Sequence, residues 1–402
     1  MLIVRKYGGT SVANAQNIIS AASSMAKLHS DRNRLVVVVS AQGDTTDELL
    51  AKAAEISDDA GKRETDALIS TGEQQSAALM AIALRAQGLP AVSLNAAQSG
   101  INATSVYGNA RIKSIDPERL RFELERGNTA VVAGFQGMNK YGDVVTIGRG
   151  GSDTTAVALA VVLNADLCEI CTDVDGVYTA DPRIVKNARK IHVISYDEML
   201  ELSSLGAKVL HSRSVEMAKR YRVPLIVRSS FSDVEGTLVK EVPHMERMYV
   251  SGVTVDKDTA GITLLGVKDE PGGAYNVFSL MAREGVSMGV ITRTAITGHG
   301  DISFTVARSE LGKVLGALEK NKGIIHYAEL RYDDRTAKIS VVGAGMESTP
   351  GVASGVFEAL YTADISVKMI STSEIKITIL VDEKDAEAAV NAIHDKFFAM
   401  GA

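Results

Sequence analysis

Short apolar runs alternate with amphipathic stretches from the start of the chain to about Val239. Six runs are rich in Val, Ile, Leu or Ala, and Gly, Ser or Asp follows them: LIVRKY, RLVVVVSA, PAVSLNA, NTAVVAGFQ, DLCEICTDV and PLIVRSS. Near-continuous apolar runs are typical of parallel strands that are covered on both faces. Helix formers at helical spacing lie between them, at 51–55, 74–85 and 154–163. The pattern predicts an α/β domain, an αβα sandwich with a mostly parallel sheet.

The rhythm changes at 241–245 (EVPHM), and an internal repeat follows. In both copies a strand ending in Gly leads to Pro-Gly and then to an amphipathic helix with Val-Phe, and Phe278 and Phe357 lie 79 residues apart. A hairpin and a second helix complete each copy, so we expect two ferredoxin-like βαββαβ units that pair with each other or with a second copy of the chain. The domains predicted are 1–242, 243–325 and 326–402.

Composition narrows the class of protein. The 402 residues suffice for two to three domains, and 43 basic against 49 acidic side chains leave a net charge of −6. That balance disfavours nucleic acid or an anionic membrane as a partner. Because no leader-like or membrane-length apolar stretch is seen, we expect a soluble cytoplasmic protein.

The two cysteines, Cys168 and Cys171, form a C-x-x-C pair that invites a redox or zinc interpretation. The pair lies in a strand-like segment, where positions three apart point to opposite faces, and no histidines at a matching spacing complete a metal site. We therefore expect two buried core residues and no metal site in the protein.

Three polar segments follow predicted strands. In the first, Lys6-Tyr7-Gly8-Gly9, paired glycines permit close approach to an anion and Lys6 adds a cation, although a simple turn is the alternative. The second is GRGGSDTT at 148–155. Ser152, Asp153 or Thr154 could merely cap the following helix, but Arg149 beside three glycines favours recognition of a carboxylate or phosphate.

The third segment, at 172–183 (TDVDGVYTADPR), begins like a calcium-binding loop. Counting from Asp173 places Ile184 where the bidentate twelfth ligand should be, so calcium is disfavoured. A polar loop beyond the carboxyl end of a strand in an open α/β sheet is well placed to hold a nucleotide.

These segments belong to a longer series that carries a resemblance. KYGGTS, VVVVSAQGDTTDELL, STGE, VAGFQG, GRGGSDTTA, TDVDGVYTADPR and LSSLGAKVLH occur in this order, followed by the two Pro-Gly repeats. Over nearly its whole length the chain resembles the monofunctional bacterial aspartate kinases, or aspartokinases. The resemblance implies an amino-acid-kinase-type catalytic domain and two regulatory ACT domains. It also implies MgATP-dependent phosphorylation of the side-chain carboxylate of L-aspartate to 4-phospho-L-aspartate, which feeds lysine, threonine and methionine synthesis.

The resemblance also implies roles for residues that match the family's motifs. The expected catalytic residues are Lys6, Asp153, which would orient Lys6, and Lys208. The substrate site would comprise Ser40, Thr46, Glu73, Arg149 and Ser152, with Glu73 on the amino group of aspartate and Arg149 on its α-carboxylate. The nucleotide site would comprise Lys6, Gly8, Gly9, Thr172, Asp173, Tyr178, Arg183 and Lys208.

The chemistry agrees with this inventory. A carboxylate nucleophile with a pKa of ~3.9 is already ionised at neutral pH, so no general base is needed. Neutralisation of charge by cations and Mg²⁺ is needed instead. His211, in a helical stretch, is accordingly expected to be a packing or capping group.

Effector positions follow from the ACT resemblance. In the first module they are Asp269, Gly272, Gly273 and Ala274, and in the second Val352, Ala353, Ser366, Val367, Ser373 and Glu374. The segment 287–293 (SMGVITR) departs from the pattern of lysine- and threonine-inhibited relatives, so the effector, lysine and/or threonine, stays open.

Alternatives remain in other classes. An acetylglutamate kinase would lack two ACT repeats, and Glu73 would be a poor partner for an acylated amine. A catalytically inactive amino-acid sensor would have lost cations that this chain keeps, and a dinucleotide-binding oxidoreductase would need a G-x-G-x-x-G after the first strand. A homo-oligomer, dimer or tetramer, is expected, or an α2β2 assembly with the chain's own C-terminal fragment started at Met245 or Met248. No homoserine dehydrogenase half is expected.

Overall fold

The computed structural model describes residues 1–30, 32–205, 209–242, 250–268, 272–296, 299–344, 346 and 351–399. The chain divides into two compact units. The first comprises Met1–Val177, Lys190–Ser204 and Lys208–Pro243, and the second comprises Tyr178–Arg189, Leu205–Ala207 and His244–Ala402. No helix in the described ranges is long and apolar enough to cross a membrane.

An eight-stranded sheet forms the centre of the first unit. In spatial order its strands are β12 (Val193–Ser195), β14 (Thr237–Lys240), β13 (Leu225–Ser229), β9 (Leu167–Thr172), β1 (Leu2–Tyr7), β2 (Arg34–Val39), β6 (Thr129–Ala133) and β3 (Ala91–Leu94). The run from β13 to β3 is parallel throughout, whereas β14 is antiparallel to β13. These six parallel strands are the six predicted apolar runs, so the mostly parallel sheet is confirmed.

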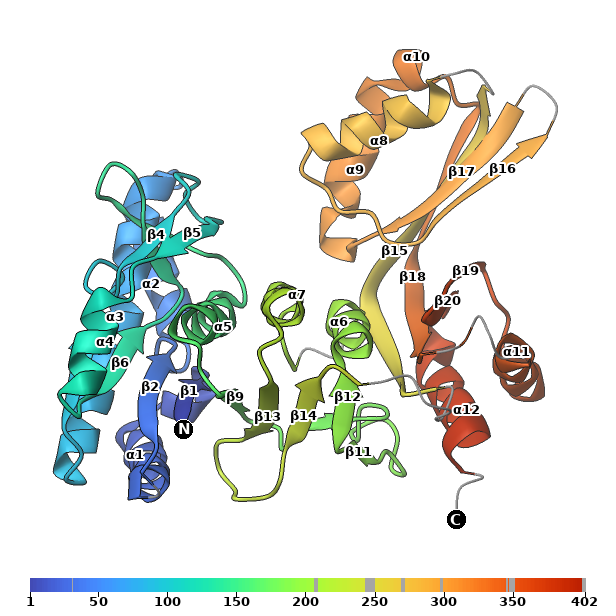
Figure 1. Cartoon of the computed structure of the whole chain (residues 1–402). Coiled ribbons are helices and arrows are strands. Elements are labelled where there is room, and N and C mark those ends of the chain that lie inside the picture. Colours follow the sequence, from blue (N-terminus) through green and yellow to red (C-terminus); the bar gives the residue numbers. More distant parts are fainter. Residues whose placement is uncertain are drawn as a thin grey trace. The chain divides into compact units, whose positions relative to one another are not determined.

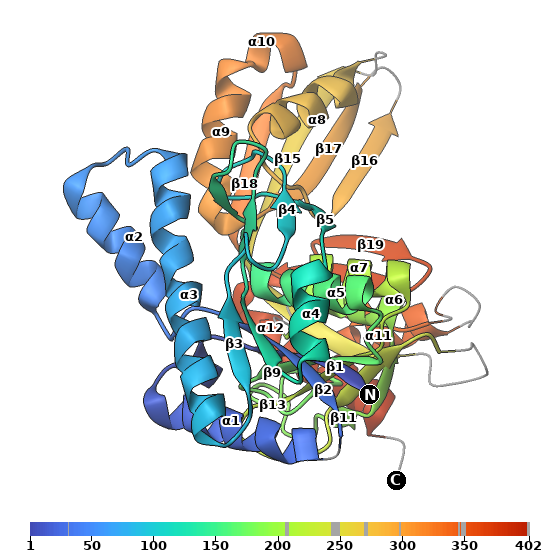
Figure 2. The same ribbon diagram turned by 60° about the vertical axis from the view of Figure 1, so that its left-hand side comes forward.

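Helices cover both faces of this sheet (Figures 1 and 2). One face is packed with α1 (Ala15–Ser30) and α3 (Lys62–Ala86), whose apolar side chains share a core with alternate residues of the central strands. The other face carries α5 (Gly151–Leu163), which contacts β1, β2 and β9. The remaining helices of the unit are α2 (Thr45–Ile56), α4 (Glu118–Glu125), α6 (Tyr196–Ser204) and α7 (Ser212–Tyr221). The αβα sandwich is therefore confirmed.

Two smaller sheets accompany the large one. The four-stranded sheet has the order β5 (Ile112–Ile115), β4 (Ile101–Ala103), β7 (Gln136–Met138) and β8 (Val144–Thr146), and the two-stranded sheet pairs β10 (Val177–Tyr178) with β11 (Lys190–Ile191). Buried Asp66 of α3 ties the four-stranded sheet to the sandwich, because its carboxylate accepts from the backbone N–H groups of Gly108 and Thr146, each at 2.9 Å.

A six-stranded antiparallel sheet forms the second unit. Its order is β16 (Ile291–Ile296), β17 (His299–Val306), β15 (Gly252–Lys268), β18 (Glu329–Val342), β20 (Lys376–Asp382) and β19 (Met369–Ser373). Its helices are α8 (Gly273–Arg283), α9 (Leu311–Lys320), α10 (Lys322–Ile325), α11 (Val352–Thr362) and α12 (Ala386–Phe398). The chain order gives both predicted βαββαβ repeats when β18 is counted in each and the N-terminal half of β15 takes the place of a strand after α12.

The two repeats share their longest strands. One core takes Ile262 from β15 together with α8 and α9, while the other takes Val253 from β15 and Ile339 from β18 together with α11 and α12. The β15–β18 register shifts between Asp256 and Gly261, between the two stretches, as a β-bulge would do. The boundary after residue 325 stays a prediction. The two cores do not follow one another along the chain, because the N-terminal half of β15, which belongs to the second core, precedes every residue of the first core.

The segment Tyr178–Arg189 belongs to the second unit, although it lies within the first 242 residues. Ala180 and Val185 are buried in the core that contains α12. The Thr179 hydroxyl lies 2.9 Å from Nε2 of His394, both residues are buried, and the Thr179 carbonyl accepts from the N–H of Val253 at 2.8 Å. This segment is therefore built into the second repeat by backbone, side-chain and apolar contacts.

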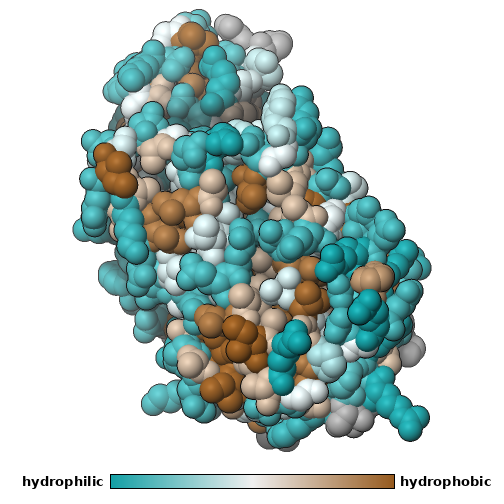
Figure 3. All heavy atoms as spheres, turned by 90° about the vertical axis from the view of Figure 1, so that its left-hand side faces the viewer, coloured by the Kyte–Doolittle hydropathy of each residue, from teal (hydrophilic) through white to brown (hydrophobic). Residues whose placement is uncertain are grey.

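Apolar side chains on the surface occur in small groups. Figure 3 shows brown patches among predominantly hydrophilic atoms on the face that lies to the left in Figure 1. On α3, for example, Leu79 and Ile82 are exposed. Scattered exposed apolar residues of this kind are normal on a protein surface.

Candidate active site

Lys6 lies near the carboxyl end of β1, on the face that carries α5. Its Nζ lies 2.6 Å from Oδ1 of Asp153, in the first turn of α5, and only 9% of Lys6 and 8% of Asp153 are exposed. An ion pair this well shielded from water holds the ammonium in one place. The contact between Lys6 and Asp153 that the resemblance implied is therefore present.

The glycine loop continues from Lys6. The N–H of Gly8 donates to the carbonyl of Cys171 on β9, and a Cβ on Gly9 would lie 2.9 Å from the carbonyl oxygen of Ala41. That approach leaves no room for a side chain at position 9. The loop is thus pressed against the segment after β2, with the Lys6 ammonium beside it.

The second glycine loop precedes α5. Gly150 occupies the N-cap position with a left-handed φ of 67°, and no side chain caps the helix. The hydroxyls of Thr154 and Thr155 donate instead to the carbonyls of Gly150 and Gly151. The alternative that Ser152, Asp153 or Thr154 caps α5 is therefore wrong. The N–H of Gly151 donates to the carbonyl of Gly148 at 2.9 Å, whereas the N–H groups of Ser152 and Asp153 have no acceptor among the described residues and are left for a ligand.

Two residues of the α7 N-terminus support this loop. A Cβ on Gly150 would lie 2.2 Å from the Cβ of His211, so only glycine fits there. His211 caps α7 by accepting from the N–H of Arg213, and burial holds its pKa below the usual value. The prediction of a packing or capping role for His211 is confirmed. Arg213 donates to the carbonyls of Ile147 at 2.7 Å and Ala110 at 3.2 Å, which fixes the residue just before the loop.

Glu73 is a buried carboxylate on α3. Its Oε1 accepts from the N–H of Ala41 at 3.0 Å, while Oε2 has no hydrogen-bond partner. Burial raises the pKa of Glu73 from 4.5 to about 7. A half-satisfied buried carboxylate is costly on its own and is relieved by a cationic partner. Ser40 directly precedes Ala41, and its N–H donates to the carbonyl of Tyr7 at 3.1 Å, which places the end of β2 beside the end of β1.

The remaining predicted substrate residues differ in exposure. Thr46 is half-buried in the first turn of α2, and Ser152 is buried in the first turn of α5. Arg149 is exposed, and in the described part of the chain it forms no ion pair. Its guanidinium is therefore available to an anion from solvent.

The predicted nucleotide residues divide between the two units. Thr172 ends β9, its hydroxyl donates to the Asp173 carboxylate, and its carbonyl accepts from the N–H of Ser230. Tyr178 and Arg183 belong to the second unit, where the guanidinium of Arg183 pairs with Asp181 at 2.7 Å. Lys208 lies outside the described residues.

The predicted effector residues occupy separate places in the second unit. Gly272, with φ of 117°, is the N-cap of α8, and Gly273 and Ala274 open that helix. Asp269 lies outside the described residues. In the second repeat Val352 and Ala353 begin α11, with Val352 buried in the core, so an effector would meet its backbone only.

The other effector positions of the second repeat lie at two further places. Ser366 and Val367 precede β19, and Ser373 and Glu374 are exposed at the turn from β19 to β20. Among the described residues, no side-chain hydrogen bond or ion pair joins these two places to the start of α11.

Two supporting residues were not anticipated. Asp66 is one of three acidic residues in α3, and Arg213 is one of two arginines in α7, so neither has a local sequence signal. Both act through backbone groups that are distant along the chain. Cys168 and Cys171, by contrast, are free and buried, as expected.

Comparisons with known proteins agree with this geometry. Residues 1–229 match the model of the amino acid kinase family, and residues 339–397 match an ACT domain model. The chain therefore belongs to the amino acid kinase family. Within that family it belongs to the aspartokinases, as its relatives show.

Aspartokinase from Corynebacterium glutamicum is 45% identical over 98% of this chain and 96% of the relative. The aspartokinase of Geobacillus stearothermophilus is 46% identical, with 98% and 97% covered. Among solved structures, E. coli aspartokinase III in complex with aspartate and ADP matches with a TM-score of 0.84 at 25% identity, covering 99% of this chain and 100% of that one. Clostridium acetobutylicum aspartate kinase matches with a TM-score of 0.79 at 26% identity, with 99% and 100% covered. The predicted family, fold class and kinase activity are confirmed.

Proposed function

We propose that the chain transfers the γ-phosphoryl group of MgATP to the side-chain carboxylate of L-aspartate, giving 4-phospho-L-aspartate and ADP. A carboxylate oxygen forms a bond to the γ-phosphorus, and the bond from that phosphorus to the bridging oxygen breaks as ADP leaves. No proton is removed from the nucleophile, because the carboxylate is already ionised. The barrier comes from bringing an anion to an anionic phosphoryl group.

The buried ammonium group of Lys6 is the main support for this proposal. Its ammonium is buried at the carboxyl end of β1, held by Asp153 and adjoining a loop of two glycines. A fixed cation there neutralises charge that develops on the transferring group and does not have to reorganise during the reaction. Gly8 and Gly9 would line the phosphates, and Thr172, Asp173, Tyr178, Arg183 and Lys208 would contact the nucleotide.

The aspartate site rests on opposite charges at two places. The free Oε2 of Glu73 suits the α-ammonium group, and Arg149 with the uncapped start of α5 suits the α-carboxylate. Ser40, Thr46 and Ser152 would line the space between. An N-acetylated substrate has no ammonium group to satisfy Glu73, which disfavours acetylglutamate.

Mg²⁺ fits this site as a companion of the nucleotide. No cluster of three or more acidic, histidine or cysteine side chains that could cage a metal occurs among the described residues. Mg²⁺ commonly binds through substrate phosphates with one or two carboxylates and water, and Asp173 stands at the nucleotide end of the site. When bound there, the ion would neutralise phosphate charge.

Feedback regulation by lysine and/or threonine is proposed for the ACT repeats. E. coli aspartokinase III has been solved in complex with lysine and aspartate, in a T-state. In this chain, the N–H groups that follow Gly272 and Gly351 begin helices and suit an amino-acid carboxylate. The effector residues assigned above from Asp269 to Glu374 are the positions to test.

A second copy of the chain is the proposed partner. In the described part of the six-stranded sheet, β16 and β19 are the outer strands, and each carries an exposed isoleucine, Ile291 and Ile370. Unpaired strand edges invite pairing with another chain. A dimer, a tetramer or an α2β2 assembly with the C-terminal fragment would satisfy them, in the cytoplasm where we propose the enzyme acts.

The deciding experiment traps the acyl phosphate with hydroxylamine. Purified protein is given MgATP with either L-aspartate or N-acetyl-L-glutamate, each with and without lysine and threonine. We expect hydroxamate from aspartate only, loss of it in Lys6→Ala, and full activity in the exposed-helix control Lys52→Ala. Equal activity on acetylglutamate, or no product from a folded protein that binds ATP, would refute the proposal, and the amino acid that inhibits identifies the effector.

A further inference from the structure

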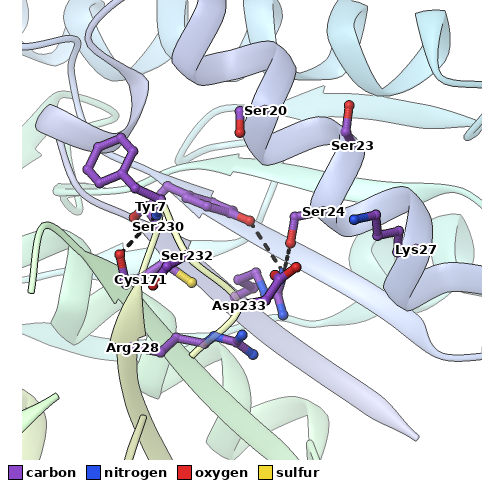
Figure 4. Close-up of a pocket in the computed structure, with 13 residues that line it drawn as sticks. Tyr7, Ser20, Ser23, Ser24, Lys27, Cys171, Arg228, Ser230, Ser232 and Asp233 are labelled. Atoms are coloured by element: carbon purple, nitrogen blue, oxygen red, sulfur yellow. Dashed lines mark hydrogen bonds between the residues drawn. The ribbon is translucent and has the colours of Figure 1, made fainter. Parts of the chain in front are cut away.

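A polar cavity lies in the first unit, on the face of the sheet opposite Lys6. It has a volume of about 200 Å³ and is enclosed by β1, α1, β9 and the loop after β13 (Figure 4). Arg5 and Tyr7 of β1 line it, and successive strand residues point to opposite faces, so Lys6 between them points away. We call it the Arg228 pocket, after the guanidinium that reaches into it from β13.

The walls of this pocket carry more positive than negative charge. Arg5 is 4% exposed, and its Nε lies 2.5 Å from Oε2 of buried Glu169. The other oxygen of Glu169 is 3.5 Å from Nη1 of Arg228, so two guanidinium groups share one carboxylate. Asp233 lines the rim but is exposed, and within the described ranges it pairs with neither arginine. Burying a charge without a full counter-charge is costly, so the pocket favours an anion.

Arg228 uses little of its bonding capacity. Of its five N–H donors, the only one engaged in the described structure is the Nη1 donor that points to Glu169, at a long 3.5 Å. Its side chain is 23% exposed, which leaves the remaining donors shielded yet reachable through the pocket. A planar guanidinium with free donors is suited to bidentate recognition of phosphate or carboxylate.

Hydroxyl groups line much of this pocket. Serines line the pocket from two sides, from α1 (Ser20, Ser23, Ser24) and from the end of β13 and the loop after it (Ser229, Ser230, Ser232). Ser24 already accepts from Arg5, whereas the hydroxyls of Ser20 and Ser232 have no partner among the described residues. Several short donors around one guanidinium match a compact acceptor with many oxygens better than an apolar ligand.

A side-chain hydrogen bond connects the pocket to the glycine loop. The hydroxyl of Ser230 lies 2.5 Å from that of Ser11, which follows Gly8 and Gly9. The N–H of Ser230 also donates to the carbonyl of Thr172 at the end of β9. An occupant that fixes the loop after β13 would therefore fix a neighbour of the glycine loop as well.

We propose that the Arg228 pocket binds a small oxyanion of the phosphate class, free phosphate or the phosphate group of a small metabolite. The anion accepts from Arg228 and the unpartnered serine hydroxyls, and it supplies the charge that Glu169 alone does not. Binding itself does not depend on the proposed function. We also expect the bound anion to lower the KM for ATP, because it would fix the glycine loop through Ser230 and Ser11. This second effect does rest on the proposed function.

The test measures binding of inorganic phosphate to the full chain by calorimetry, against chloride at equal ionic strength. The catalytic site would also attract phosphate, so the titration is done with Lys6→Ala and, in parallel, with wild type saturated with ADP. We expect saturable binding of one phosphate per chain to Lys6→Ala and to the ADP-saturated wild type. Adding Arg228→Gln to either background should weaken this binding at least tenfold. Arg220→Gln, an exposed arginine on α7, serves as the matched control and should bind like wild type.

Loss of phosphate binding in Lys6→Ala with retention in Arg228→Gln would overturn the proposal, as would the absence of saturable binding to either background. If Arg228→Gln does not fold, Ser232→Asp places a carboxylate at the rim without removing Glu169's partner, and it too should weaken binding at least tenfold. Glycerol 3-phosphate distinguishes the sources: tighter binding than phosphate indicates a metabolite, and weaker binding indicates free phosphate. A failure of aspartate phosphorylation with phosphate binding intact would refute the proposed function alone.

Discussion

Two neighbouring residues of β1 show how one strand can carry two different cations. Lys6 pairs with Asp153 on the α5 face, and Arg5 pairs with Glu169 on the α1 face. The carboxylate of Asp153 begins a helix beside two glycine loops, whereas that of Glu169 lies on the adjacent strand, in register with Arg5. The side chains of the first pair are 11% and 12% exposed, and those of the second 4% and 5%. The position of the carboxylate thus determines whether the cation can reach a substrate.

Lys6→Ala should show the largest effect. The variant removes the cation that meets the transferring phosphoryl group, so kcat should fall by roughly 10³-fold, the size typical of losing one preorganised electrostatic group. Binding of aspartate, measured by calorimetry, should be nearly unchanged, because Glu73 and Arg149 remain. A variant that keeps most of its kcat would mean that Lys6 is structural, like Arg5.

Glu169→Gln should affect stability instead. It leaves Arg5 buried without a counter-charge, which costs about 3 kcal/mol or more. The free energy of unfolding in urea measures this loss. Asp153→Asn is the matched control, because its partner Lys6 is closer to solvent, and we expect it to lose less than half as much. Equal losses would show that the two pairs do not differ as described.

Glu73 should make the binding of aspartate depend on pH. The ammonium of aspartate pairs with the ionised form, so the KM for aspartate should fall as the pH rises towards about 7, by about tenfold per unit below the pKa, and then level off. Glu73→Gln should bind aspartate weakly, and its KM should be flat over this range. A wild-type KM that is independent of pH would contradict the assigned contact.

The same carboxylate predicts a pH effect on the free protein. The folded pKa is raised from 4.5 to about 7, so the folded state holds this proton more tightly than the unfolded state does. The contribution of Glu73 to stability is therefore fully present below pH 4.5 and is lost as the pH rises through about 7. Urea titrations of wild type and Glu73→Gln between these limits measure the difference.

Thr179→Val should give the smallest effect and supplies a neutral pair for comparison. The variant removes a buried hydroxyl that bonds Nε2 of His394 and also accepts from the N–H of Arg189, so about 1 to 2 kcal/mol of stability should be lost. Thr362→Val, whose hydroxyl bonds within an exposed helix turn, should change stability by no more than about 0.5 kcal/mol. A loss as large as that of Glu169→Gln would show that charge is not what separates these pairs.

Much of the sandwich could be predicted from the sequence because its signals are local. Each parallel strand is one apolar run, and each is closed by a polar turn. The shared strands of the second unit could not be foreseen, because a run such as 252–268 has the same alternation whether it serves one core or two. The strand partners of each half of β15 lie far along the chain: its N-terminal half pairs with β18, and its C-terminal half pairs with both β17 and β18.

The site shows the same division. The resemblance identified Lys6, Asp153 and Glu73 by their motifs, and the structure added that Glu73 keeps one oxygen free. Arg213 could not be found this way, since its partners are backbone carbonyls 66 and 103 residues distant, which any residue type provides. Tyr178 and Arg183 match a nucleotide motif, yet the side chain of Thr179 between them is hydrogen-bonded to His394 of α12.

The hydrogen bond between Thr179 and His394 spans 215 residues of sequence. A ribosome makes the chain from its N-terminus, so Thr179 leaves it long before its partner exists. Ala180 and Val185 must likewise wait for α12 to complete their core. The segment carrying Tyr178 and Arg183 therefore acquires its final surroundings only when the last helix has been translated, and a nascent chain that stops short of α12 is left with an unfinished loop.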